Sequence, residues 1–395
     1  MIRNMYIGLT AILLITTASS QTSPTRWRVD WLGVLPNGNY SKATDVSNQG
    51  DCVGYGDYSP SSDSGYYTRG WIWRNGTLNI LHYGAITDNS CALCISPDGG
   101  LIGGAGKIQL VFPDYLVGGV PVIWGHSCTV QAFPESTAFN RVGAVYDISA
   151  NGIAAVTLGT ATAGPGQAYW WQVCTENYGR LPINHPCHPA QISPADVFSV
   201  SYDGAVFVGD ASCASDEAFT RVNRIGFVFT HTASLLGSGI TCDNLCNSSV
   251  TMSISGNNRV ISGRLNQQGG VWLRTQTGWV FEIFPQPDFI PAVSNGIDYH
   301  GVTVVGSLGQ RAVAWENSDA GWVKLDLTDI CHRLGILSRD DRLITATAVS
   351  PNARYIVGVG LRKIRNENGQ DQYRAEAFRI DRRIARILPI PIPWE

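Results

Sequence analysis

The chain carries little charge. Only 15% of its 395 residues are Asp, Glu, Lys or Arg, and the formal net charge is −3. Nucleic-acid-binding proteins usually carry a basic surface that attracts phosphates, so this composition disfavours nucleic acid as a partner. Gly-rich phosphate loops, paired zinc-binding His motifs and the nucleophile elbow of hydrolases are also missing. We therefore expect no cofactor and no resident metal.

Long apolar runs are equally scarce. The most apolar stretch, residues 7–17, follows Arg3 and precedes the small residues Ala18, Ser19 and Ser20. A run of this length is too short to span a bilayer, which takes roughly 20 residues. Its flanks are typical of a secretory signal. The sequence predicts a signal peptide over 1–20, cleaved after Ser20, and an extracellular domain over 21–395 without membrane insertion.

Ten cysteines fit an exported protein, because thiols in that number usually form disulfides outside the cytosol. Cys174 and Cys187 flank one loop and Cys242 and Cys246 flank another, so we expect these two local bridges. The pairing of the other six is open. The pair Cys91-Ala-Leu-Cys94 could join Cys242 and Cys246 in a four-thiolate zinc site. In a strand its two thiols point to opposite faces, which favours structural cysteines.

Three sequons could carry N-linked glycans in a eukaryotic secretory pathway. They begin at Asn39, Asn75 and Asn247.

One motif recurs seven times along the chain. It begins with a strand of alternating apolar and polar residues that usually ends in Ser, followed by a tight turn and a short apolar strand that ends in Gly. After a gap of variable length comes an aromatic strand such as Trp71-Ile72-Trp73. The copies span residues 43–54, 92–103, 144–159, 198–209, 251–263, 293–306 and 345–358. Their closing glycines are 43 to 56 residues apart, a spacing close to that of propeller blades. The sequence predicts an all-β fold, a seven-bladed β-propeller of four-stranded antiparallel blades.

The segment 26–32 resembles an outer strand but precedes the first copy. We predict that this N-terminal strand pairs with the last blade and closes the ring, which would remove an exposed sheet edge.

Loop lengths differ between the two faces of such a ring. The turns between first and second strands are uniformly short and should share one face. The connections after second strands, such as 55–70, 105–119 and 210–225, are long and irregular and should emerge on the opposite face. Variable loops on a rigid scaffold usually carry function, so we expect binding on this long-loop face.

Candidate binding residues lie near the inner ends of these long connections. Arg264, Arg311 and Arg362 fall close to the second-strand ends of blades five to seven, and we expect them to line a cationic funnel that could hold an anion or glycan. The other candidates are Lys107, Asp210, His185 and His188. The two imidazoles could bind a metal or act as a base, but Pro186 between them favours a braced surface loop.

The first repeat copy resembles the probable extracellular HAF-type repeat. The resemblance rests on Leu32-Gly33, Ser41-Lys42-Ala43, Val53-Gly54 and the aromatic strand Trp71-Ile72-Trp73. It covers most of the chain as a pattern, although no copy carries the His-Ala-Phe triplet and the cysteines are additional. The resemblance implies a secreted propeller and no catalytic residues.

These features favour a secreted binding or structural module whose long-loop face holds an extracellular glycan or protein. Two alternatives remain open. The chain could be a carbohydrate-active enzyme, a polysaccharide lyase or glycoside hydrolase with its site in the cationic funnel. It could also assemble with copies of itself as a subunit of an extracellular fibre or surface layer.

Overall fold

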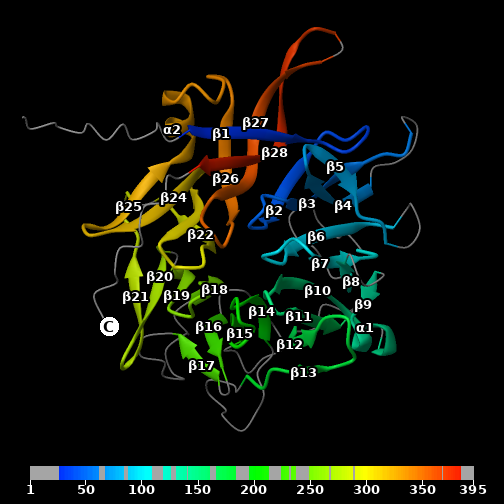
Figure 1. The fold of residues 1–395 in the computed structure, drawn as a ribbon, viewed down its shortest axis with the longest axis vertical. Helices are drawn as coiled ribbons and strands as arrows, with labels where there is room; N and C mark the ends of the chain where they lie inside the picture. The colour runs from blue at the N-terminus through cyan, green and yellow to red at the C-terminus, as the bar shows by residue number, and fades with distance from the viewer. Residues whose placement is uncertain are drawn as a thin grey trace, which may run out of the picture.

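The computed structural model describes residues 26–61, 67–83, 88–108, 119–125, 130–139, 141–160, 166–183, 195–212, 224–230, 233–236, 249–266, 268–287, 290–366 and 368–383. These residues form seven four-stranded antiparallel sheets arranged around one axis (Figure 1). The predicted seven-bladed propeller is confirmed. The predicted signal peptide over 1–20 lies outside the described residues. No helix in the described ranges is long and apolar enough to cross a membrane.

Each blade runs from an inner strand on the axis to an outer strand at the rim. Blade 1 contains β2 (Ser41–Val46), β3 (Cys52–Tyr58), β4 (Tyr67–Arg74) and β5 (Thr77–Ile80). Blade 2 contains β6 (Ser90–Ile95), β7 (Leu101–Gly106), β8 (Val120–Gly125) and β9 (Gln131–Ala132). Blade 3 contains β10 (Arg141–Ile148), β11 (Ile153–Thr160), β12 (Gln167–Gln172) and β13 (Tyr178–Arg180). Blade 4 contains β14 (Ala195–Val200), β15 (Phe207–Ser212), β16 (Arg224–Phe229) and β17 (Ala233–Leu236).

The remaining blades follow the same order. Blade 5 contains β18 (Ser249–Ile254), β19 (Val260–Leu265), β20 (Gln268–Thr275) and β21 (Gly278–Ile283). Blade 6 contains β22 (Ala292–Ile297), β23 (Thr303–Leu308), β24 (Arg311–Ser318) and β25 (Gly321–Asp326). Blade 7 contains β26 (Arg342–Val349), β27 (Tyr355–Arg365), β28 (Asp371–Arg383) and the N-terminal β1 (Arg26–Gly33). Two short helices, α1 (Pro134–Phe139) and α2 (Leu327–Arg333), follow blades 2 and 6.

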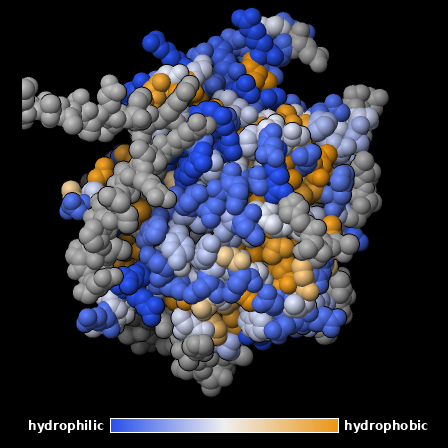
Figure 2. Space-filling view, viewed as in Figure 1, coloured by the Kyte–Doolittle hydropathy of each residue, from blue (hydrophilic) through white to orange (hydrophobic). Residues whose placement is uncertain are grey.

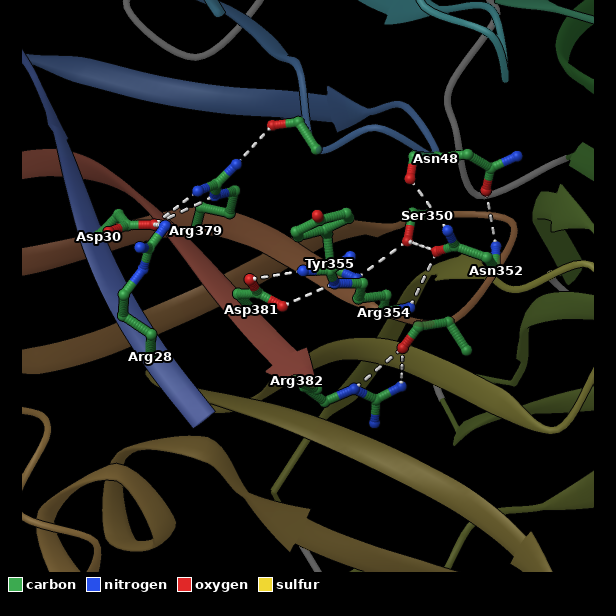
Figure 3. A network of polar contacts seen from close by, with 12 residues as sticks. Arg28, Asp30, Asn48, Ser350, Asn352, Arg354, Tyr355, Arg379, Asp381 and Arg382 are labelled. Carbon is green, nitrogen blue, oxygen red and sulfur yellow. Dashed lines mark hydrogen bonds and ion pairs between the residues drawn. The ribbon is translucent and has the colours of Figure 1, made fainter. Parts of the chain in front are cut away.

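Ring closure by the N-terminal strand is confirmed. Strand β1 pairs antiparallel with β28, so blade 7 is built from both ends of the chain. The Arg379 guanidinium contacts Asp30 Oδ2 of β1 at 2.7 Å and donates to Gly50 O of the blade 1 turn at 2.8 Å (Figure 3). The Asn352 amide donates to Asn48 O at 3.0 Å. Polar contacts therefore join blade 7 to blade 1 at the closure.

The tight turn after each inner strand lies on one face, which we call the short-turn face. Its third residue has a positive φ in all seven blades, from 59° at Ala353 to 85° at Gly50. Backbone hydrogen bonds connect neighbouring turns, including Asn48 N to Pro97 O at 3.0 Å and Ala150 N to Tyr202 O at 3.0 Å. The short-turn face is therefore tied together around the axis.

Every inner strand contains a β-bulge. In each blade the register against the second strand shifts shortly before the turn, where one residue is skipped, and β26 of blade 7 has a second shift at Ile344. These bulge residues are Thr44, Leu93, Tyr146, Phe198, Met252, Asn295 and Thr347. Glycines next to the bulges allow a close backbone approach. A Cβ added at Gly306 would lie 1.8 Å from Val293 O, and one added at Gly54 would lie 2.0 Å from Lys42 O.

The repeated aromatic residues fill the space between blades. Trp71, Trp171 and Trp315 have no exposed surface, and neither do Phe227 and Phe378 on the third strands of blades 4 and 7. Large rings supply much of the buried apolar area in such a fold. These five aromatic side chains are therefore core residues and not a sugar-binding surface.

Candidate functional site

An axial cavity of about 160 Å³ lies where the seven inner strands meet. All seven bulge residues border it. A collar of Val and Ile at the last position of each inner strand borders it as well, and turn residues such as Tyr202 and Tyr299 line its end at the short-turn face. The cavity is thus built from one equivalent segment of every blade.

The bulge residues divide the cavity wall into a polar and an apolar half. In blades 6, 7 and 1 they are Asn295, Thr347 and Thr44, and each donates to a carbonyl of the following blade at 2.7 to 3.0 Å. In blades 2 to 5 they are Leu93, Tyr146, Phe198 and Met252. The polar members therefore hold neighbouring blades together, while the apolar members present their side chains to the cavity.

Two carboxylates occupy the position after the bulge, in blades 1 and 3. Asp45 accepts from Val46 N at 2.7 Å and from Ile95 N of the next blade at 2.8 Å. Asp147 accepts from Ser199 Oγ at 2.6 Å and Val200 N at 2.9 Å, both in blade 4. Each side chain thus bridges two blades beside the axis.

The pKa of the Asp45 carboxyl is raised to about 8, mainly by burial and also by the negative charge of Asp147. Burial also raises the pKa of Asp147, against the opposing effect of its Ser199 hydrogen bond. Asp45 is therefore mostly protonated at neutral pH.

A third carboxylate, Asp298, replaces the usual Ser at the start of the blade 6 turn. It accepts from Val302 N at 2.8 Å and Thr303 N at 2.7 Å. Burial raises its pKa, and these backbone donors lower it. Asp298 therefore fixes the turn.

None of the three predicted arginines borders the axial cavity. Arg264 is half-buried at the end of β19. Arg311 contacts Asp326 and Asp329, each at 2.6 Å. Arg362 contacts the buried carboxylate of Glu376 at 3.0 Å. Two of the three positive charges are therefore already paired.

The other candidates are dispersed. Lys107 is exposed after β7 with a φ of 52°, and Asp210 is 4% exposed within β15. His185 and His188 lie outside the described residues. In the described ranges, no group of three or more His, Cys, Asp or Glu side chains is placed to hold a metal.

The predicted modification sites are only partly described. Asn39 and Asn75 are exposed, as a glycan acceptor requires, while Asn247 lies outside the described residues. Cys187, Cys242 and Cys246 also lie outside, so both expected bridges stay predictions.

Four of the cysteines in the described ranges are free and buried, and the sequence did not single them out as free thiols. They are Cys52, Cys91, Cys94 and Cys331. The expectation that Cys91 and Cys94 point to opposite faces was wrong. The bulge at Leu93 lies between them, so Cys91 pairs with Ala105 and Cys94 with Gly103, and both thiols lie on the same face of blade 2.

The long-loop face carries a projecting hairpin at blade 7. Strands β27 and β28 pair with each other from Tyr355↔Asp381 out to Arg365↔Asp371. Their neighbours end earlier: β26 pairs with β27 only as far as Leu361, and β1 pairs with β28 only as far as Ala377. The hairpin therefore extends beyond its sheet at the top of Figure 1, and Figure 2 shows its end as hydrophilic.

The cavity-lining positions were missed by reasoning from the sequence. One signal could have revealed them: the residue three places before the turn Ser varies from Thr to Leu, Tyr, Phe, Met and Asn, whereas the last residue of each inner strand is always Val or Ile. A variable position inside a regular repeat indicates a side chain outside the packed core.

No protein-family model matches the chain, and no curated protein matches it. Solved propellers resemble it in fold. The β-propeller domain of Cps50 (Swd1) from Myceliophteria thermophila is 10% identical over 90% of this chain and 99% of that chain, with a TM-score of 0.49. YCF48 bound to a D1 peptide is 10% identical over 90% and 94%, with a TM-score of 0.47. A prolyl endopeptidase is 11% identical over 87% of this chain and 46% of that chain, with a TM-score of 0.45. The HAF-type resemblance stays a prediction.

Proposed function

We propose that this protein is a secreted binding module that holds a protein partner on its long-loop face. The projecting β27–β28 hairpin supports the proposal most directly. Beyond Leu361 and Ala377 its two strands pair with each other. The described residues add one β-bridge, between Tyr40 and Ala375, and a hydrogen bond from Lys363 N to Asp341 Oδ1 at 2.8 Å. Strands with open edges offer backbone donors and acceptors to an extended segment of another protein.

Side chains on the hairpin fit the same role. Tyr373 is 56% exposed, and the Arg365 side chain is 81% exposed. Tyr and Arg are enriched at protein interfaces, where they contribute much of the binding energy. Lys363 contacts Asp340 and Asp371 at 3.0 and 2.9 Å, so the base of the hairpin is held by ion pairs while its end stays accessible.

The pairing of the arginines disfavours the enzyme alternative. A polysaccharide lyase needs a cation that can neutralise a uronate carboxylate beside a base. Arg311 and Arg362 already contact carboxylates, and neither borders the axial cavity. We therefore infer binding without catalysis.

The experiment is an affinity screen of residues 21–395 against arrays of extracellular proteins and of glycans. We expect a protein ligand whose affinity falls at least tenfold with Tyr373→Ala and with Arg365→Ala. Val302→Ala is the matched control, because Val302 is 37% exposed in a turn of the opposite face. If only glycans bound, the proposed protein partner would be wrong and a glycan would take its place. Depolymerisation of an anionic polysaccharide by the purified protein would overturn the non-catalytic assignment.

A further inference from the structure

The axial cavity is separate from the hairpin, and the described residues that border it include acids but no base. Three carboxylates border it, whereas the described residues that line it include no Lys, Arg or His. Asp298 is used by its own turn. Asp45 and Asp147 remain, and they accept hydrogen bonds from backbone N–H groups and from the Ser199 hydroxyl. Dipoles alone stabilise these acids, so a positive charge in the cavity would be favourable.

An aromatic wall lies next to one of these acids. The rings of Tyr146 and Phe198 meet edge to face with centroids 5.7 Å apart, and both border the cavity. Tyr146 precedes Asp147 in β10, and Phe198 precedes Ser199, whose hydroxyl donates to Asp147 at 2.6 Å. An aromatic face attracts an organic cation, most strongly where water is excluded.

The volume of the cavity limits what it can hold. A cavity of about 150 Å³ in another protein accommodates benzene, so about 160 Å³ suits a ligand of roughly six to eight non-hydrogen atoms. Met252 and Leu93 continue the apolar half of the wall. Their side chains can contact alkyl groups but cannot bind a metal ion through oxygen.

We propose that the axial cavity binds a small organic ammonium ion, with its charge beside Asp45 and Asp147 and its alkyl groups against Tyr146 and Phe198. Calcium and magnesium require six or more oxygen ligands or a retained water shell. The apolar half of this wall favours an alkylammonium ion instead.

Binding should be coupled to proton release. The groups that act electrostatically on Asp45 or feel its charge are Asp147 on β10, Cys94 on β6 and Cys52 on β3. Because the pKa of Asp45 is raised to about 8, the empty cavity keeps a proton there at neutral pH. A bound cation favours the ionised form, so affinity should rise as the pH rises from 6 to 8.

Met252 provides a direct readout. The other two methionines, Met1 and Met5, lie in the segment predicted to be removed. A ¹³C-methyl-methionine spectrum of residues 21–395 should therefore show one signal, from inside the cavity. We expect tetramethylammonium and choline to shift this signal saturably, with an affinity about tenfold higher at pH 8 than at pH 6. The neutral isostere 3,3-dimethyl-1-butanol should bind at least tenfold more weakly.

Two variants test the assignment. Asp147→Asn should weaken choline binding at least tenfold, and Phe198→Leu, which keeps an apolar side chain, should weaken it about threefold. Asp319→Asn is the matched control, because this carboxylate is exposed on a rim turn and does not border the cavity. Equal binding of the cation and its neutral isostere would overturn the proposal. So would a signal shift with calcium or sodium chloride but none with tetramethylammonium.

Discussion

Replacing Gly306 with Ala should destabilise the propeller substantially. Gly306 lies on β23, opposite the bulge of blade 6. An added Cβ would lie 1.8 Å from Val293 O and 2.9 Å from Val293 C, and both are backbone atoms. Real Cβ atoms essentially never approach another heavy atom within 3.0 Å, so β22 and β23 would have to separate by more than 1 Å.

The size of the effect follows from this displacement. Overpacking a well-ordered core typically lowers the free energy of unfolding by about 1 to 3 kcal/mol. Backbone atoms cannot move aside as a side chain can, so for Gly306→Ala we expect a loss of about 3 kcal/mol. A domain of roughly 370 residues has an unfolding entropy of about 0.8 kcal/mol/K, so this loss lowers Tm by about 4 °C.

Differential scanning calorimetry of the wild type and Gly306→Ala measures the shift. Gly100→Ala is the control, because its added Cβ meets only the flexible Asp98 carboxylate at 3.3 Å. Its Tm should stay within about 1 °C of the wild type. Equal Tm values for Gly306→Ala and Gly100→Ala would refute the view that the repeated Val-Gly motif exists to allow backbone approach at the bulge.

Three further predictions concern buried polar groups. Because the folded pKa of Asp45 is raised above its unfolded value, its contribution to stability is complete below about pH 4 and is lost as the pH rises through 8. The free energy of unfolding in urea should be about 2 kcal/mol lower at pH 8 than at pH 6, and Asp45→Asn should remove most of this difference. Arg382→Met should lower the free energy of unfolding by about 2 kcal/mol, because Ala353 O loses its donor. Arg28→Met removes an exposed ion pair and should lower it by less than about 0.5 kcal/mol in the same assay. Burial raises the pKa of Cys91 to about 12, so the four buried free thiols should not react with Ellman's reagent at pH 8 until the protein is unfolded; rapid labelling of the native protein would contradict their burial.

Much of the architecture could be predicted from local sequence. The seven copies of one motif indicated seven blades, because turn residues and alternating apolar residues act within a few positions of each other. The segment 26–32 was matched to the last blade because it resembled an outer strand that had no neighbours of its own. The candidate site could not be found in this way. Arg264, Arg311 and Arg362 all lie near a second-strand end, yet their neighbours are set by blades 5 to 7 individually, and two of them are paired.

The sequence by itself determined the blade count, the short turns and the aromatic core, since each depends on residues close together in one repeat. Only the tertiary structure decided what lies on the axis. The bulge in every inner strand turns one side chain out of the packed sheet, and closing the ring then brings seven such side chains, from residues 44 to 347, around one cavity. Asp45 and Asp147 became a pair of interacting acids for the same reason: they are 102 residues apart in the chain and are brought together by the circular arrangement of the blades.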